Sequence, residues 1–173
     1  MFQQKNILLV SRNFWPDRSS CSSILYNVAK YFSEKKNKVE IITSFPKKYN
    51  IQISKEQLFE RDKGHNLKIN RINLFKENRS AFSRIFNALL LAGFGSLELN
   101  RKKYDVVIVT STPPILTAFI LCIFCKIYRK KFIYYCMDIN PEIGILSGDF
   151  KNKILKKFLL EMDKFTCCQA NNV

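Results

Sequence analysis

Two carboxylates stand in a short segment, DINPE, directly after the apolar run KFIYYCM. Asp138 opens this segment and Glu142 closes it. A carboxylate at the end of a buried strand can orient or deprotonate a substrate hydroxyl. We therefore take Asp138 as the candidate catalytic residue and Glu142 as a candidate to support it or to bind a ligand hydroxyl. The alternative is that Asp138 caps the turn at Asn140 and Pro141.

Serines dominate a second polar segment, FWPDRSSCSS, at Phe14–Ser23, between an apolar run and a helical pattern. In many α/β proteins this junction binds phosphate, because the free amides and the dipole of a helix N-terminus attract anions. Such loops are rich in glycine, whereas this one has none. Ser19, Ser20 and Cys21 are candidates for phosphate contact, and a plain serine N-cap is the alternative.

Hydroxyl groups also precede the pair Pro113-Pro114, as Ser111 and Thr112. Proline in the first turn starts a helix without losing a hydrogen bond, so these hydroxyls can cap that helix or contact a ligand.

Cysteine spacing offers one further possibility, because Cys122 and Cys125 form a CxxC pattern inside an apolar run. No second pair and no histidine cluster completes a zinc site. We expect these two residues to be buried core thiols, and we expect neither a metal nor a cofactor.

Strand and helix patterns alternate along the chain. Five short apolar runs predict strands, and four longer segments with apolar residues three or four positions apart predict helices. This alternation predicts one α/β domain over 1–173, a doubly wound, mainly parallel, Rossmann-like sheet with helices on both faces. Ligands of such sheets bind beyond the carboxyl ends of the strands, where the polar segments lie. The expected strands are Asn6–Ser11, Lys38–Ser44, Leu67–Asn73, Tyr104–Ser111 and Lys131–Met137, and the expected helices are Ser20–Lys36, Ser80–Arg101, Pro113–Arg129 and Lys151–Cys168.

The expected helix at Ser80–Arg101 carries a stripe of large apolar side chains. A stripe of this kind usually faces the core, so we expect it to pack on the sheet. The alternative is that the helix lays surplus apolar surface, Leu91 for instance, on lipid. The stripe consists of Phe82, Ile85, Phe86, Leu89, Leu90, Phe94 and Leu97.

Lysine and arginine number 29 against 14 acidic residues, a net charge of +15 that predicts an anionic partner. The basic residues are spread over many segments without a recognition motif, so nucleic acid is not the expected partner. Basic clusters flank apolar helices, which favours an anionic membrane surface. The continuous apolar runs are shorter than the roughly 20 residues of a spanning helix, and no export signal is recognisable. We expect a cytoplasmic protein, peripheral on the inner face of the cytoplasmic membrane.

Five segments, in order, resemble the N-terminal domain of family 4 glycosyltransferases of the GT-B fold, above all those that build bacterial surface polysaccharides. FWPD is similar to the family's (F/Y)xPE, YNVAKYF to YxLAxxL, and KNKVEIIT to GHxVxVxT, while DVVIVTSTPP is similar to DVVxxxSPP and DINPE to DxWPE. The resemblance covers nearly the whole chain. It departs from the family where the first loop's glycines fall on Ser20 and Cys21, and where the Gly and His of the third motif are missing.

The resemblance implies transfer of a sugar from a nucleotide-sugar, without metal or cofactor, to a lipid-linked or polysaccharide acceptor. It implies that Asp138 acts on the acceptor hydroxyl, and that Asp17, in place of the family's Glu, binds acceptor or substrate. For Asp17 the alternative is a residue that stabilises the turn after Pro16. Further implied ligand contacts are Ser111, Thr112 and Glu142 for acceptor or substrate, and Ser19, Ser20 and Cys21 for the donor diphosphate.

The chain ends in CCQANNV, where a further strand is expected, and it lacks the Glu-x7-Glu element of the family's donor domain. We therefore expect the acceptor-side half of an enzyme, truncated before its nucleotide-sugar domain. The alternative is a non-catalytic, membrane-docked subunit of a split glycosyltransferase, and the DNA downstream of Val173 would separate the two. A dinucleotide enzyme is disfavoured, because G-x-G-x-x-G does not follow the first apolar run.

Overall fold

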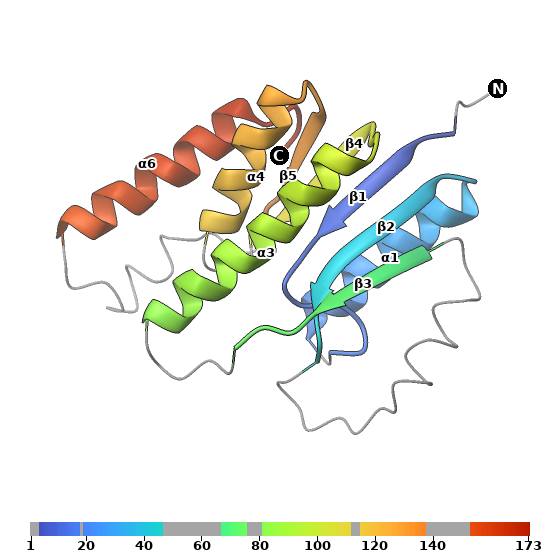
Figure 1. The fold of residues 1–173 in the computed structure, drawn as a ribbon, viewed down its shortest axis with the longest axis horizontal. Helices are drawn as coiled ribbons and strands as arrows, with labels where there is room; N and C mark the ends of the chain where they lie inside the picture. Colours follow the sequence, from blue (N-terminus) through green and yellow to red (C-terminus); the bar gives the residue numbers. More distant parts are fainter. Residues whose placement is uncertain (1–3, 18, 47–66, 76–80, 112–114, 138–152) are drawn as a thin grey trace.

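The computed structural model describes residues 4–17, 19–46, 67–75, 81–111, 115–137 and 153–173 (Figure 1). The strands and helices of these residues follow one another in the order that the sequence predicts, and the observed ends fall within a few residues of the expected ones. The strands are β1 (Asn6–Val10), β2 (Lys38–Ser44), β3 (Leu67–Ile72), β4 (Val106–Thr110) and β5 (Lys131–Tyr135), and the helices are α1 (Ser20–Glu34), α3 (Ala81–Arg101), α4 (Leu116–Ile127) and α6 (Lys153–Gln169).

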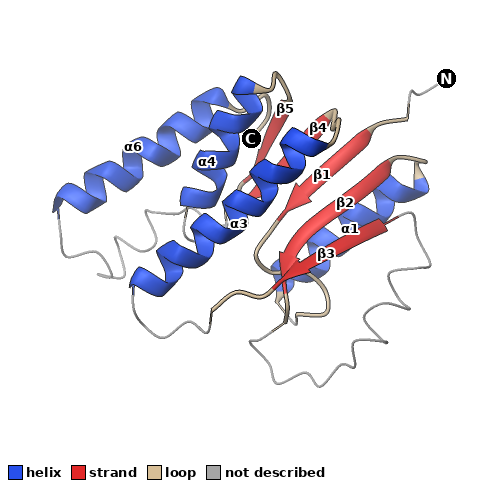
Figure 2. Cartoon of the chain, in the orientation of Figure 1, coloured by secondary structure: helices blue, strands red, loops and turns tan. Residues whose placement is uncertain are grey.

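The five strands form one parallel sheet in the order β3-β2-β1-β4-β5. Figure 2 shows the strands side by side with the helices against them. Strands β1 and β4 are buried along almost their whole length, because helices cover both faces of the sheet. The chain leaves β1 toward β2 on one side and returns to β4 on the other side. The strand order therefore reverses between β1 and β4.

Helix α1 covers one face of the sheet, and α3, α4 and α6 lie next to one another over the other face (Figure 1). Each face has its own apolar cluster, because successive strand residues point to opposite sides. Ile7 and Leu9 of β1 pack toward Leu25 and Ala29 of α1. Leu8 and Val10 belong to the cluster beneath α3 and α4. The prediction of a doubly wound, Rossmann-like α/β fold is confirmed.

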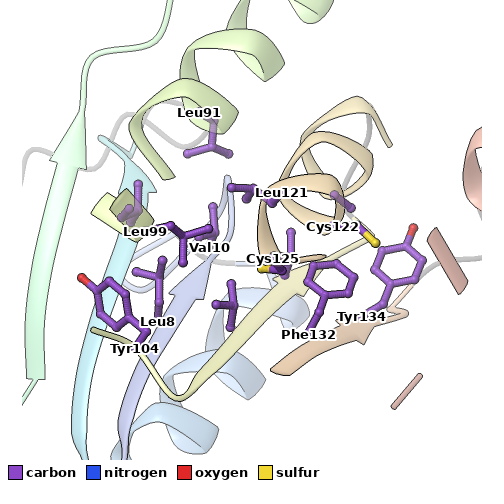
Figure 3. Packing of buried hydrophobic residues seen from close by; sticks show 14 residues of the cluster. Leu8, Val10, Leu91, Leu99, Tyr104, Leu121, Cys122, Cys125, Phe132 and Tyr134 are labelled. Carbon is purple, nitrogen blue, oxygen red and sulfur yellow. The ribbon is translucent and has the colours of Figure 1, made fainter. Parts of the chain in front are cut away.

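Helix α3 faces the sheet with its small side chains, which contradicts the expected orientation. Leu91, offered above for contact with lipid, is only 3% exposed and points at the core beside Val10 and Leu121 (Figure 3). A Cβ atom on Gly95 would lie 2.8 Å from Cδ2 of Leu121 in α4. Because α3 and α4 approach this closely, a side chain at position 95 would require Leu121 to move. The buried side of α3 holds Asn87, Ala88, Leu91, Ala92, Gly95, Ser96 and Leu99.

The large apolar stripe of α3 consequently points away from the sheet. Six of its seven residues are 40–77% exposed, and the prediction that they pack on the core was wrong. We call these six residues the outer stripe of α3: Phe82, Ile85, Phe86, Leu89, Phe94 and Leu97.

A buried acid, Glu40, joins the sheet to the end of α3. Its carboxylate accepts hydrogen bonds from Lys102 Nζ at 2.7 Å, Tyr104 Oη at 2.8 Å and Asn70 Nδ2 at 2.6 Å, and Lys68 Nζ lies 3.2 Å away. Burial by itself raises the pKa of Glu40, but the hydrogen bonds outweigh this effect and lower the pKa to about 2. The ionised carboxylate thus ties β2 and β3 to the segment between α3 and β4.

The last residues of the chain run beside β5. Asn172 forms a parallel bridge with Ile133, and its carbonyl accepts a hydrogen bond from the Tyr134 amide at 3.0 Å. The cysteines differ in environment: Cys122 and Cys125 are buried under the α3 layer, as expected, whereas other thiols reach the surface. Among these is Cys168 near the end of α6, which is exposed.

Candidate functional site

The crevice beyond the carboxyl ends of β1 and β4 is the candidate site. In an open parallel sheet, the loops after two neighbouring strands leave in opposite directions where the strand order reverses, and ligands bind between them. Here the loop after β1 leads to α1 on one face, and β4 leads to α4 on the other. The ends of β1 and β4, about a hundred positions apart in sequence, meet at this point, since Thr110 Oγ1 lies 3.2 Å from Ser11 Oγ.

Aromatic packing holds the FWPD segment after β1. Phe14 is fully buried, and its ring centroid lies 6.1 Å from that of Tyr26 in α1. Trp15 packs on the same tyrosine at 5.7 Å, and its carbonyl accepts a hydrogen bond from Arg71 Nη2 of β3 at 3.0 Å. The following peptide, Trp15–Pro16, is cis. Core packing therefore determines the path of this loop.

Asp17 lies at the end of this turn and is 5% exposed. Its amide donates a hydrogen bond to the Phe14 carbonyl at 3.0 Å, which closes the turn. The backbone of Asp17 makes this bond, so a turn-stabilising role of its side chain stays a prediction. Contact between Asp17 and a ligand stays a prediction.

Strand β2 holds the beginning of the loop from the other side. The carbonyl of Arg12 accepts hydrogen bonds from Thr43 Oγ1 at 3.1 Å, Ser44 Oγ at 2.9 Å and the Ser44 amide at 3.2 Å. Three donors on one carbonyl fix the backbone where the chain leaves β1. The crevice thus has a rigid wall on the β1 side.

Helix α1 begins beside the crevice with Ser19 as its N-cap. Ser19 has extended backbone angles, and its Oγ accepts from the Ser22 amide at 3.2 Å. The N-cap is one residue earlier than Ser20, where the family's first glycine falls. Ser20 and Cys21 are the first two helical residues, and amides at these positions have no acceptor within a helix. The first turn of α1 contains no acid that would repel an anion.

Ser111 holds the other side of the crevice together. Its amide donates to the Tyr135 carbonyl at 3.0 Å, and its Oγ accepts from the Met137 amide at 2.9 Å. Ser111 therefore bridges the ends of β4 and β5. Thr112, Asp138 and Glu142 themselves lie outside the described residues.

A small hollow lies between these strand ends and α3. Besides apolar residues it is lined by Ser11, Arg12, Asn87, Thr110 and Thr117. The Asn87 amide group is 2% exposed and binds the backbone of Phe75 twice, at 2.8 Å and 3.0 Å. This pair of hydrogen bonds fastens the segment after β3 to α3.

Sequence reasoning did not single out Ser11, Thr110 or Asn87. The first two had a usable signal, because each stands at the end of a β-branched or apolar run that predicts a buried strand. Asn87 had only a weak one, as a polar residue inside an apolar helix. Among the described residues, no group of three or more His, Cys, Asp or Glu side chains is placed to hold a metal ion.

Comparisons with known proteins show the fold only. No family model matches the chain, and no curated protein matches it. Two crystal structures of the C-terminal domain of the PF1911 hydrogenase from Pyrococcus furiosus are similar, with TM-scores of 0.54 and 0.52 and identities of 15% and 16%. These matches cover 78% of this chain and 94% and 95% of the others. A glycosyltransferase from Rickettsia africae is matched with a TM-score of 0.42 and 20% identity, over 77% of this chain and 30% of that one.

Proposed function

We propose that this chain is the acceptor-binding domain of a glycosyltransferase that moves a sugar from a nucleotide-sugar to a lipid-linked or polysaccharide acceptor in surface glycan synthesis. The observation that carries the proposal is that two of the resembling segments follow neighbouring strands whose ends are in contact. FWPD and STPP follow β1 and β4, and the hydroxyls of Ser11 and Thr110 touch at the base of both segments. The third segment, DINPE, starts just after Met137, whose amide Ser111 holds.

The chemistry needed at this crevice is the orientation and deprotonation of an acceptor hydroxyl. A carboxylate such as Asp138 can accept that proton, and Glu142 can hold a neighbouring hydroxyl. The amides at the start of α1 offer hydrogen bonds to a diphosphate brought by a donor-binding domain. Neither role requires a metal or a cofactor from this chain.

A binding titration tests the proposal. A short-chain polyprenyl-diphosphate-linked sugar would be titrated into the purified chain by calorimetry, with a set of nucleotide-sugars and NAD as comparison ligands. The proposal expects the lipid-linked sugar to bind, nucleotide-sugars to bind weakly, and no transfer to occur with the chain alone. Loss of a hydrogen bond to a charged group costs about 1.5–3 kcal/mol, so Asp138→Ala and Glu142→Ala should each weaken binding by about 10- to 100-fold.

Glu34→Ala is the matched control. Glu34 is an exposed acid at the last residue of α1, at the opposite end of the helix from the crevice. It should bind the acceptor like the wild type. Tight binding of NAD without binding of any sugar ligand, an equal loss in all three variants, or sugar transfer by the chain alone would each contradict the proposal.

A further inference from the structure

Most of the large apolar side chains exposed at the surface lie on the layer formed by α3, α4 and α6. Of the fifteen large apolar side chains that are exposed in the described part of the chain, eleven lie on α3, α4 and α6. Only two, Ile24 and Tyr31, lie on α1 at the opposite face. Monomeric soluble domains rarely gather exposed apolar residues in this way without a partner. The eleven are the outer stripe of α3 together with Ile127, Ile154, Leu155, Phe158 and Phe165.

The sheet cannot take up the outer stripe, because the other side of α3 is already packed. A Cβ atom on Gly95 would lie 2.8 Å from Leu121 Cδ2, and Thr117 Oγ1 donates a hydrogen bond to the Ala88 carbonyl of α3. Asn87 accepts a hydrogen bond from the Phe75 amide after β3. Residues Phe82–Arg101 are long and apolar enough to cross a bilayer by length and composition, but 39% of the apolar window is buried inside the domain. Only the outer half of the helix is therefore available to a partner.

The same layer is strongly basic, which narrows the choice of partner. Residues 81–103, 116–131 and 153–169 hold twelve lysines and arginines and three acids. Arg84, Arg101 and Lys103 are exposed at the two ends of α3, and Lys157 and Lys164 are exposed on α6. A second copy of this chain, with its net charge of +15, would bring like charges together, whereas an anionic lipid surface complements them.

We propose that the outer stripe of α3, with the exposed side of α6, docks on an anionic membrane surface and makes this a peripheral membrane protein. An interfacial helix buries its apolar side about 5–10 Å into the lipid, at the boundary between headgroups and acyl chains. The 21-residue α3 lies in the membrane plane, and the basic side chains at its ends reach the lipid phosphates. An anionic membrane would be a partner of the proposed glycosyltransferase domain. The docking proposal does not rest on that function, because docking requires no sugar ligand.

Vesicle flotation tests the docking surface. The purified full chain would be mixed with phosphatidylcholine vesicles or with vesicles that contain 30% phosphatidylglycerol, at about 0.1 M and 0.5 M salt. The proposal expects binding to the anionic vesicles and weaker binding to neutral vesicles. Binding should also weaken at the higher salt concentration, because the Debye length falls from about 10 Å at 0.1 M toward about 3 Å at 1 M. Sedimentation velocity in the absence of lipid should show a monomer.

Two matched double variants locate the surface. Leu89→Glu with Phe94→Glu changes two residues of the outer stripe that are 45% and 48% exposed. Ile24→Glu with Tyr31→Glu changes two residues of α1 that are 45% and 56% exposed. Both add the same charge at similar exposure on opposite faces. The α3 variant should bind anionic vesicles at least tenfold more weakly than wild type, because each half-exposed apolar side chain removed from lipid lowers the affinity several-fold. The α1 variant should bind with an affinity within about threefold of wild type.

Circular dichroism and thermal unfolding of both variants show whether each is folded, which exposed positions should allow. Absence of wild-type binding to anionic vesicles would overturn the proposal. So would an equal loss in both variants, or a wild-type dimer that the α3 variant breaks, which would make a second copy the occupant. The acceptor titration is independent of this assay, so failure of one proposal is distinguishable from failure of the other.

Discussion

Two glycines two positions apart on α3 offer a direct measure of which side of this helix faces the core. A Cβ atom on Gly95 would lie 2.8 Å from Cδ2 and 3.3 Å from Cδ1 of Leu121, whereas a Cβ atom on Gly93 would meet nothing within 4 Å. Both positions are in the middle of the helix. The substitutions Gly93→Ala and Gly95→Ala therefore differ in packing and share the same change in helix propensity.

The magnitudes follow from these contacts. Replacing glycine by alanine inside a helix gains about 0.8–1 kcal/mol at either position. At Gly95 the new methyl group needs carbon atoms to move from 2.8 Å to the ordinary separation of roughly 3.5–4 Å. Leu121 is fully buried, so its movement disturbs the core, and overpacking of this kind costs about 1–3 kcal/mol. Gly93→Ala should stabilise the protein by about 1 kcal/mol, and Gly95→Ala should range from neutral to about 2 kcal/mol destabilising.

Urea unfolding followed by circular dichroism measures both variants. A difference of 1 kcal/mol corresponds to about 2–4 °C in Tm for a domain of this size, so calorimetry provides a second readout. In the background of Leu121→Ala, where the two Cδ atoms are gone, Gly95→Ala should become stabilising. Equal stabilisation by both single variants would refute the orientation of α3, and with it the argument that its outer stripe is exposed.

Three further outcomes are expected. Glu40→Gln should lose about 2–3 kcal/mol at neutral pH, because the pKa of this carboxyl is lowered to about 2. Because the pKa is lowered, the stabilisation is present above the unfolded-state pKa near 4.5 and is lost as the pH falls from about 5 toward 2. The free energies of unfolding of wild type and variant should therefore converge in acid. Ser19→Ala should cost about 1 kcal/mol as the loss of an N-cap, while Ser20→Ala, one residue into the helix, should change unfolding by less than about 0.5 kcal/mol; equal losses would place the cap elsewhere. In thiol labelling at neutral pH, exposed Cys168 should react at once, whereas Cys125, whose pKa burial raises to about 12, should react only on unfolding. Rapid labelling of both would show that the α4 core is open.

Much of the fold was predictable because it depends on local periodicity. Runs such as ILLV and VVIVT are short and apolar, and they alternate with segments of helical spacing. This pattern predicts a parallel sheet covered by helices. The same pattern put the polar segments directly after β1 and β4, and a ligand site there stays a prediction. Contacts between distant residues were not predictable: nothing near Glu40 in the sequence indicates Lys102 or Tyr104, 62 and 64 positions away.

The orientation of α3 shows where sequence reasoning stops and tertiary structure decides. Both sides of this helix are apolar, so its period predicts a helix but does not say which side is buried, and the larger side chains were assigned to the core. At Gly95 the helix leaves no room for a larger side chain against Leu121. Leu91 and Leu99 fill other parts of its buried side, and the outer stripe points outward. The sequence alone thus determined the elements and their order. Only the packing of the layers decided that Ser11 meets Thr110 and that an apolar and basic surface faces outward, because both depend on distances between elements that no local pattern contains.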